Sequence, residues 1–155
     1  MRYLLIGFIL SFSLITNAQD ESVEWQTDVV QAVNLSIKEG KPLCLFFTGS
    51  DWCGWCRRLQ GEVFTKPKFQ KWAEENVILV ELDFPKKKKL DPKIQQQNME
   101  IAQMFGIQYY PTIWFVTPTI DGQQISFNKI GSTGYVAGGP DVWIKEADKI
   151  LGSRK

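Results

Sequence analysis

Apolar residues along the chain fall into two patterns, helical spacing and short unbroken runs. Between residues 28 and 39 the valines and an isoleucine lie near one helical face, and Gly40 follows as a stop signal. The next run, at residues 43–48, is almost wholly apolar and is bounded by Pro42 and Gly49. A short apolar run between chain breakers is typical of a strand buried on both faces. The pattern therefore predicts a helix followed by a central strand.

The same two patterns continue to the end of the chain. Helical spacing predicts further helices at residues 53–63, 67–75, 91–105 and 140–151. Runs of β-branched and apolar residues predict further strands at residues 77–83, 112–117 and 124–130. Asp121-Gly122 is a hairpin signal, so the last two strands should be antiparallel. The glycine-rich residues 131–139 are interpreted as a loop that turns the chain.

The order of these elements defines the fold class. Helices that alternate with strands predict an α/β protein, and the hairpin near the end requires a mixed sheet. We therefore expect a three-layer α/β/α sandwich with a central mixed β-sheet and right-handed crossovers. A chain of 155 residues with no internal repeat fits one domain of this type.

The first 18 residues differ from the rest of the chain. Arg2 precedes an apolar run at residues 3–15, and small residues flank a cleavage point after Ala18. The run has 13 residues, fewer than the roughly 20 that a permanent membrane-spanning helix needs. We therefore interpret residues 1–18 as a secretory signal peptide and residues 19–155 as the mature domain, periplasmic or secreted and without stable membrane insertion. An uncleaved N-terminal anchor is the alternative.

Composition narrows the chemistry that this domain can perform. The chain contains no His, so Ser-His-Asp catalysis, Cys-His catalysis and His-ligated metals are excluded. The formal net charge is +1 and no nucleic-acid motif accompanies it, so nucleic acid is not expected as a partner. The chain has three Cys, an odd number, so at least one is free or pairs with another molecule. Reactive groups must come from carboxylates, amines, hydroxyls or thiols.

Two of the cysteines, Cys53 and Cys56, stand three positions apart where a predicted strand gives way to a helix. This spacing allows a disulfide, and it places Cys53 near the helix start, where free N–H groups and the helix dipole stabilise a thiolate. Motifs of this kind lower the thiol pKa from about 8.5 into the range of roughly 3.5 to 7.5. We therefore predict that Cys53 attacks a partner disulfide and that Cys56 resolves the mixed disulfide.

Aromatic residues flank the two cysteines. Trp52 and Trp55 can shield sulfur and contact a polypeptide substrate, while Gly54 keeps the turn between the cysteines unobstructed. Large aromatic side chains usually serve the core first, so packing is the alternative interpretation for both tryptophans.

The sequence resembles the thioredoxin superfamily in three places: the strand at residues 43–47, the segment Trp52-Cys53-Gly54-Trp55-Cys56, and the triplet Tyr110-Pro111-Thr112. The resemblance covers residues 24–152. It is strongest to secreted bacterial thioredoxin-like proteins and to the C-terminal domain of periplasmic thiol:disulfide interchange proteins. It implies a thioredoxin fold and a redox-active pair formed by the two cysteines of the segment.

The resemblance also implies a binding groove for substrate. It implies a cis peptide bond between Tyr110 and Pro111, and in such proteins the residue before the cis proline binds an extended substrate through its backbone. Tyr110 and Pro111 are therefore expected substrate-binding residues. A glycine ahead of the last helix lines the same groove in relatives, and Gly131 and Gly134 both match it.

The chain departs from thioredoxin in two respects. Thioredoxin has a buried Asp in the strand before its cysteines, but the matching positions here are Phe46 and Phe47, so the proton acceptor for Cys56 is unidentified. The residues between the cysteines are Gly54 and Trp55, where thioredoxin has Gly-Pro and the oxidising relatives commonly have His. Without an imidazolium beside it, Cys53 loses one stabiliser of the thiolate. This second difference favours a reducing role.

Other residues near the pair have two interpretations. Cys44 lies within the predicted strand and is interpreted as a buried, unreactive thiol rather than a redox partner. The four lysines at residues 86–89 form a solvated loop or a docking patch for an acidic partner. One of Arg57 and Arg58 tunes Cys53 electrostatically, or both lie on the surface.

A Cys-x-x-Cys pair has uses besides redox chemistry. It can form half of a zinc site, ligate an iron–sulfur cluster shared across a dimer, or close a purely structural disulfide. Only one further Cys and no His are present, so the second half of a zinc site is missing. We therefore expect no metal and no cofactor.

These observations predict an extracytoplasmic thiol:disulfide oxidoreductase that exchanges electrons with cysteines of protein substrates, in the reducing direction. Its partners would be cysteine-containing proteins and an unidentified redox partner, and a monomer is expected. The rival within the same fold is a disulfide isomerase or oxidase. The rival from another class is a non-catalytic module that binds polypeptides and uses its disulfide as a brace.

Overall fold

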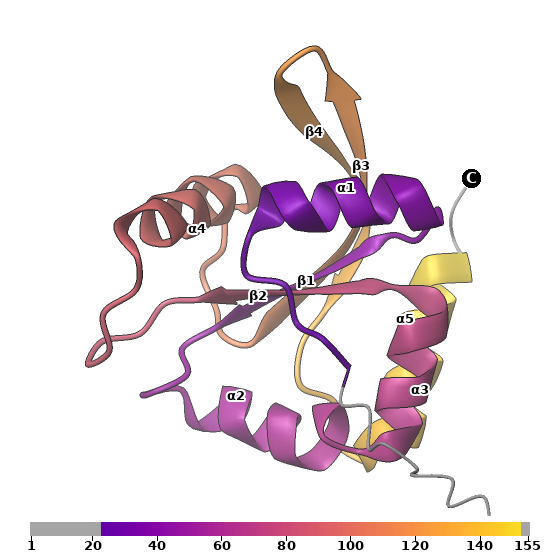
Figure 1. The fold of residues 1–155 in the computed structure, drawn as a ribbon. Coiled ribbons are helices and arrows are strands. Elements are labelled where there is room, and N and C mark those ends of the chain that lie inside the picture. The colour runs from indigo at the N-terminus through magenta and orange to yellow at the C-terminus, as the bar shows by residue number, and fades with distance from the viewer. Residues whose placement is uncertain (1–22, 153–155) are drawn as a thin grey trace, which may run out of the picture.

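Within residues 23–152, which the computed structural model describes, a four-stranded mixed sheet forms the centre of the protein (Figure 1). Strand β1 (Leu43–Thr48) pairs in parallel with β2 (Ile78–Asp83) and antiparallel with β3 (Thr112–Asp121). Strand β3 also pairs antiparallel with β4 (Gln124–Thr133). The strand order is therefore β2-β1-β3-β4, and the predicted mixed sheet is confirmed.

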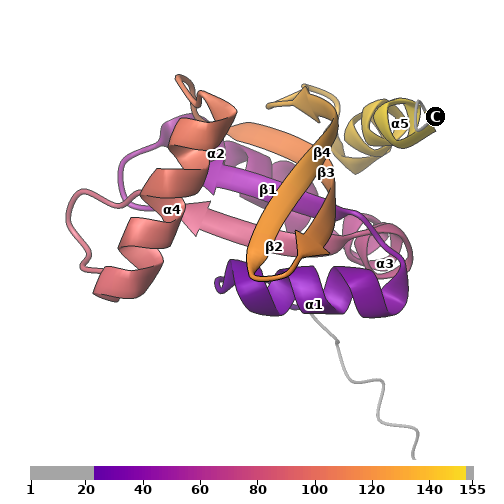
Figure 2. The same ribbon diagram turned by 90° about the horizontal axis from the view of Figure 1, so that it is seen from above.

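Helices cover both faces of this sheet, as Figures 1 and 2 show. On one face lie α1 (Val29–Glu39) and α4 (Pro92–Phe105). On the other face lie α2 (Gly54–Leu59), α3 (Pro67–Asn76) and α5 (Gly139–Gly152). A sheet between two layers of helices confirms the predicted three-layer α/β/α sandwich.

Strand β1 contributes side chains to the cores of both layers. All six of its residues are buried, as its apolar run predicts. Cys44 and Phe46 point into the cluster formed with α2, α3 and α5. Leu43, Leu45 and Phe47 point into the cluster formed with α1 and α4. This alternation follows from the two-residue period of a strand and explains why the run has no polar face.

Helices α1 and α4 begin and end where the sequence predicts. The carboxylates of Asp28 and Asp91 accept backbone N–H groups in the first turn of α1 and α4, respectively. Gly40 and Gly106 end the same helices in the left-handed conformation, with φ of 67° and 62°. Local capping chemistry therefore sets the limits of both helices.

The helix predicted at residues 53–63 differs in its second half. Helix α2 continues into a π-helical turn, η1 (Gln60–Phe64), in which the N–H of Thr65 donates to the carbonyl oxygen of Gln60 at 3.0 Å. A π-helical turn holds more residues than an α-helical one. The extra residue allows Val63 and Phe64 both to be buried.

The β3–β4 hairpin is longer than the sequence predicts, because both strands run beyond their predicted ends. Gly131 therefore lies in β4, paired with Phe115, and the prediction of a loop from residue 131 onward is wrong at this position. A Cβ atom at Gly131 would lie 2.7 Å from Cγ2 of Ile150 in α5. This glycine allows close packing of α5 on the sheet and does not form a turn.

The signal peptide predicted at residues 1–18 lies outside the described residues, so its cleavage stays a prediction. Within residues 23–152 no helix has the length and apolar character to cross a membrane. The segment with the paired cysteines lies where the chain leaves the central strand β1 and enters α2. The fold thus places this segment at the carboxyl end of an interior strand.

Candidate active site

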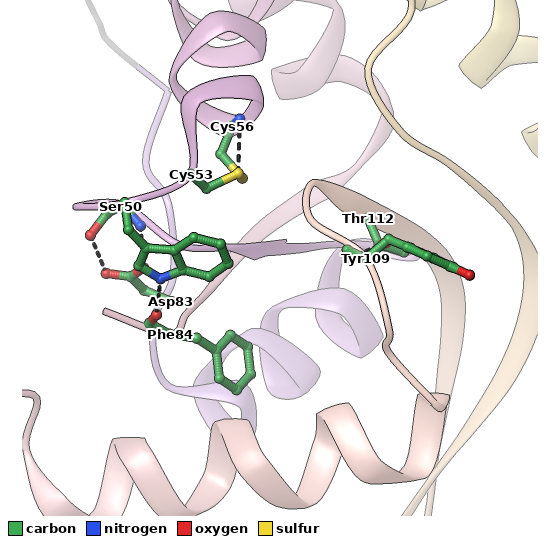
Figure 3. Close-up of a disulfide and its surroundings, with 8 residues drawn as sticks. Ser50, Cys53, Cys56, Asp83, Phe84, Tyr109 and Thr112 are labelled. Carbon is green, nitrogen blue, oxygen red and sulfur yellow. Dashed lines mark hydrogen bonds between the residues drawn. A yellow bond between two sulfur atoms is a disulfide. The ribbon is translucent and has the colours of Figure 1, made fainter. Parts of the chain in front are cut away.

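Cys53 and Cys56 form a disulfide at the start of α2 (Figure 3). The two sulfur atoms are 2.10 Å apart, and the Cα atoms are 5.3 Å apart. Cys53 is the N-cap residue of α2, and its Sγ accepts the N–H of Cys56 at 3.1 Å. Cys53 is 6% exposed and Cys56 is 0% exposed. The structure therefore joins the predicted pair and makes Cys53 the outer member.

The turn that connects β1 to the disulfide is held by a hydrogen bond within the turn and by the end of β2. The N–H of Cys53 donates to the carbonyl oxygen of Gly49 at 2.8 Å. Asp83, the last residue of β2, accepts the N–H of Ser50 at 2.8 Å and its hydroxyl at 2.6 Å (Figure 3). These bonds fix the position of Cys53 relative to the sheet.

Trp52 forms an aromatic wall beside the disulfide turn. Its indole N–H donates to the carbonyl oxygen of Phe84 at 2.8 Å. Its ring meets that of Tyr110 edge-on, with ring centroids 5.5 Å apart. The ring centroids of Tyr110 and Phe84 are 5.6 Å apart. The ammonium group of Lys86 lies 4.2 Å from the Trp52 ring centre. These contacts favour the packing interpretation for Trp52.

Trp55 offers a second aromatic surface, and its side chain is much more open to solvent. It is 54% exposed, and its ring lies 5.2 Å from that of Tyr135. The guanidinium of Arg58 lies 5.4 Å from the Trp55 ring centre and 5.3 Å from that of Tyr135. Glu62 accepts hydrogen bonds from Tyr135 at 2.6 Å and from Arg58 at 2.7 Å. The hydrogen bond from Tyr135, and then that from Arg58, lower the pKa of Glu62.

The two arginines that follow the cysteine pair, Arg57 and Arg58, are both exposed. Arg58 faces Glu62 and two aromatic rings, so its charge is paired with that of Glu62. The side chain of Arg57 forms no ion pair within the part of the chain that the structure describes. Exposure agrees with the surface interpretation of both residues, and the tuning of Cys53 by one of them stays a prediction. Tyr135 could not be predicted from the sequence, because its partner Glu62 is 73 positions away.

The peptide bond between Tyr110 and Pro111 is cis, as the resemblance implies. Tyr109, just before it, is 75% exposed, its carbonyl accepts the Thr112 hydroxyl at 2.7 Å, and its side chain points away from the disulfide in Figure 3. A Cβ atom at Gly134 would lie 3.2 Å from the carbonyl oxygen of Pro111. Gly134 is therefore the glycine beside the cis proline, since the other candidate packs against α5.

No acid stands at the position where thioredoxin has its buried Asp. Phe46 lies in the same apolar cluster as both cysteines, whereas Phe47 lies on the opposite face of the sheet. Glu81 of β2 is the register partner of Phe46. Burial, and then the charge of Asp83, raise the pKa of Glu81. The interior behind the disulfide is thus aromatic, and the carboxyl group next to it in the sheet disfavours ionisation.

Cys44 is fully buried in β1, which confirms its predicted burial. Burial raises the pKa of its thiol well above the ordinary value, so the thiolate does not form near neutrality. Within residues 23–152 no group of three or more His, Cys, Asp or Glu residues could hold a metal ion. The reactive sulfur atoms of the described chain are therefore those of the disulfide.

The four lysines at residues 86–89 are exposed, as predicted, but their loop is tied to the active-site turn. The carboxylate of Asp51 accepts the backbone N–H groups of Lys86, Lys87 and Lys88 at 2.9, 2.7 and 3.0 Å. These hydrogen bonds, led by that of Lys86, lower the pKa of Asp51 to about 2. Asp51 thus connects the lysine loop to the segment that carries Cys53.

A disulfide of Cys-x-x-Cys spacing at the start of the helix that follows the central strand, with a cis proline in the same sheet, defines a class of protein. The class is that of thiol:disulfide oxidoreductases with the thioredoxin fold. The chain belongs to the thioredoxin-like family, because the family model described as a thioredoxin-like domain matches residues 29–137.

Known relatives support this assignment. Disulfide bond reductase DsbH of Chlamydia pneumoniae is 31% identical over 119 residues, which are 75% of this chain and 70% of that protein. Thioredoxin-related protein DsbJ of the same organism is 30% identical over 95% of this chain, which spans only 44% of DsbJ. The solved structure of a DsbH oxidoreductase matches with a TM-score of 0.75 and 27% identity, over 96% of each chain.

A more distant structure shows the fold alone. The solution structure of a thioredoxin from Thermus thermophilus matches with a TM-score of 0.62 at 15% identity, over 84% of this chain and 88% of that one. The thioredoxin fold implied by the sequence is therefore confirmed.

Proposed function

We propose that this protein reduces disulfides of other proteins outside the cytoplasm, with Cys53 as the attacking thiol and Cys56 as the resolving thiol. The observation that carries the proposal is the order of the pair, in which Cys53 caps the helix and Cys56 is fully buried behind it. A partner disulfide can therefore reach Sγ of Cys53 first. The signal-like residues 1–18 support export to a compartment where disulfides persist.

Reduction consists of two exchanges that conserve electrons. The Cys53 thiolate attacks one sulfur of the partner disulfide, which forms a mixed disulfide and releases the other partner sulfur as a thiolate. The Cys56 thiol then loses its proton and attacks Sγ of Cys53, which closes the Cys53–Cys56 disulfide and releases the second partner thiolate. Two electrons pass to the partner, whose thiolates take up protons. A redox partner protein must then reduce the Cys53–Cys56 disulfide for the next turnover.

The surroundings of Cys53 support a moderate rather than an extreme stabilisation of its thiolate. The N–H of Cys56, which already points at Sγ of Cys53, can donate to the thiolate after reduction. No His adds a positive charge, because the chain has none, and Arg58 is paired with Glu62. A very stable thiolate favours the reduced form and makes a protein an oxidant. The lack of a His beside Cys53 therefore supports the reducing direction, in agreement with the name of the relative DsbH, disulfide bond reductase.

The substrate surface that we propose consists of exposed aromatic and backbone groups around the disulfide. Trp55 presents a half-exposed ring, and a Cβ atom at Gly54 would meet no atom within 4 Å, so the surface between the cysteines is open. The backbone next to the cis bond of Tyr110 and Pro111 can pair with an extended polypeptide, as in strand addition. Trp52 contributes the wall behind this segment.

Insulin reduction in the presence of dithiothreitol tests the proposal. We expect turnover by the wild type and by Cys44→Ala, and only the background rate for Cys53→Ser. Cys56→Ser should accumulate mixed disulfides with partners through Cys53, because the resolving thiol is missing. Equal turnover by the wild type and by Cys53→Ser would overturn the proposal and leave the polypeptide-binding module as the alternative.

The reduction potential of the Cys53–Cys56 pair tests the direction of electron flow. Equilibration of the Cys53–Cys56 pair with glutathione places it on the scale of related proteins, which runs from roughly −270 mV for thioredoxin to about −120 mV for a strong oxidant. We expect a value toward the thioredoxin end. A value near the other end would favour an oxidase or isomerase over a reductase.

A further inference from the structure

A groove lies between the lysine loop and the start of α4, beside the disulfide turn. We call it the lysine groove, and its volume is about 530 Å³. Its lining combines basic and apolar side chains, among them Lys86, Lys88, Lys89, Phe84, Pro85 and Met99. Met99 is 57% exposed, so an apolar surface is open to solvent between the ammonium groups. This combination fits a polypeptide segment of another protein that carries both apolar and negatively charged side chains.

The charge of the lysine groove is positive and is not neutralised by ion pairs. Three lysines and one carboxylate, that of Asp83, line it. Lys86, Lys88 and Lys89 take part in none of the ion pairs found within residues 23–152. Asp51 binds the backbone of the lysine loop, and the charge of Lys88 acts on the carboxylates of both Asp51 and Glu81. The formal net charge of the chain is only +1, so this positive potential is a local feature.

The lysine groove is held at a fixed position relative to Cys53. The three hydrogen bonds to Asp51 tie its loop to the residue two positions before Cys53. The indole of Trp52 donates to Phe84, which lines the groove, and Figure 3 shows Phe84 next to the turn that carries Cys53. Lys86 packs over the same indole. A ligand in the groove is therefore held next to the turn that carries Cys53.

We propose that the lysine groove binds an acidic segment, with apolar side chains among its acids, in the protein whose disulfide Cys53 attacks. The inference rests on the proposed function, since it names the class of substrate for the same site. Opposite charges steer association and raise its rate, and the apolar lining contributes contact area once the segment is seated. A concave site admits a chain, whereas a flat layer of lipid head groups reaches only the outer ends of the lysines.

Two matched peptides test the inference. Both contain the same disulfide, and one has Glu-Leu-Glu beside it where the other has Gln-Leu-Gln. The rate constant for reduction by the reduced wild type should be about tenfold larger for the acidic peptide at low salt, since two charge pairs roughly 6 Å apart in water each contribute about threefold. At about 1 M salt, where the Debye length is about 3 Å, the ratio should approach one.

Lysine variants test whether the preference for the acidic peptide arises in the lysine groove. Lys88→Gln combined with Lys89→Gln should reduce the ratio between the two peptides to about one at low salt, because both ammonium groups are lost. The matched control is Lys71→Gln combined with Lys145→Gln, which removes the same charge from α3 and α5 and should keep the tenfold ratio. A ratio that falls equally in both variants would show that net charge, not the groove, is responsible, and would overturn the inference.

A redox-independent readout separates this inference from the proposed function. The same peptides with Ser in place of both cysteines are titrated into the protein and followed by fluorescence anisotropy, and the acidic peptide should bind more tightly. Reduction of both peptides at equal rates, with equal binding, would overturn the inference and leave the reductase intact. Failure to reduce either peptide, with preferential binding retained, would instead overturn the reductase. Co-sedimentation with phosphatidylglycerol vesicles that requires Lys88 and Lys89, without a peptide preference, would assign the groove to lipid and overturn the inference.

Discussion

Gly49→Ala should destabilise the protein, because the indole of Trp52 occupies the space that a side chain at residue 49 needs. A Cβ atom there would lie 2.4 Å from Cε2 and 2.5 Å from Nε1 of Trp52. Gly49 is not one of the described glycines with positive φ, so its backbone conformation is open to Ala. The clash is therefore relieved only if the indole moves.

The contacts of the indole set the size of the effect. Moving it breaks the hydrogen bond to Phe84, which is worth about 1 kcal/mol. It also loosens the edge-to-face contact with Tyr110, worth about 0.5–1.5 kcal/mol. We therefore expect the free energy of unfolding to fall by about 2 kcal/mol, within the range for overpacked sites.

Urea denaturation followed by circular dichroism measures this loss, and a second background tests its cause. In a Trp52→Ala background the same Gly49→Ala change should cost less than about 0.5 kcal/mol, because the clashing ring is gone. Gly61→Ala is the matched control, since a Cβ atom there meets no atom within 4 Å and Ala suits a helical turn. An equal loss in both backgrounds would refute the steric argument.

Three further predictions follow from the titrating groups and the N-terminus. Cys44 should not react with iodoacetamide in the reduced native protein, because burial raises the pKa of its thiol, and it should react after unfolding in guanidinium. Mass spectrometry measures the labelling, and labelled Cys44 in the folded protein would contradict the prediction. The pKa of Glu81 is raised in the folded protein, so the free energy of unfolding falls as pH rises from the pKa of the unfolded chain, about 4.3, toward that of the folded protein. The melting temperature of Glu81→Gln should therefore rise relative to that of the wild type between pH 4 and pH 7. A difference that does not change with pH would contradict this prediction. Export from a Gram-negative host should give a mature N-terminus at Gln19, whereas an intact Met1 would indicate an uncleaved anchor.

The fold was largely predictable, because burial imposes its own period on each element. The run in β1 lacks a polar face since helices cover both sides of that strand. The hairpin was less predictable. The second half of β3 was not predicted, because Pro118 and the polar residues after it are untypical of a strand. Gly131 was assigned to a loop, because the reason for a glycine in a strand there is its close contact with Ile150 of α5, which the sequence does not reveal.

The disulfide could be predicted because its spacing and its place before a helix lie in one short segment. Its supports could not, because they join distant parts of the chain. The carboxylate of Asp51 binds backbone groups 35 to 37 positions away, and Tyr135 binds Glu62 across 73 positions. No local pattern encodes such pairs. They become visible only after the sheet has brought the segments together.

The two tryptophans beside the disulfide differ in how they are held, and this difference decides what a substitution would report. Trp52 is fixed by a hydrogen bond and an edge-on ring, so its replacement changes both stability and any contact with substrate. Trp55 is 54% exposed and contacts Arg58 and Tyr135. The ion pair of Arg58 with Glu62 is exposed too, and exposed pairs of this kind contribute little to stability. A change in reduction rate caused by replacing Trp55 therefore measures substrate contact, whereas the same change at Trp52 combines contact with folding.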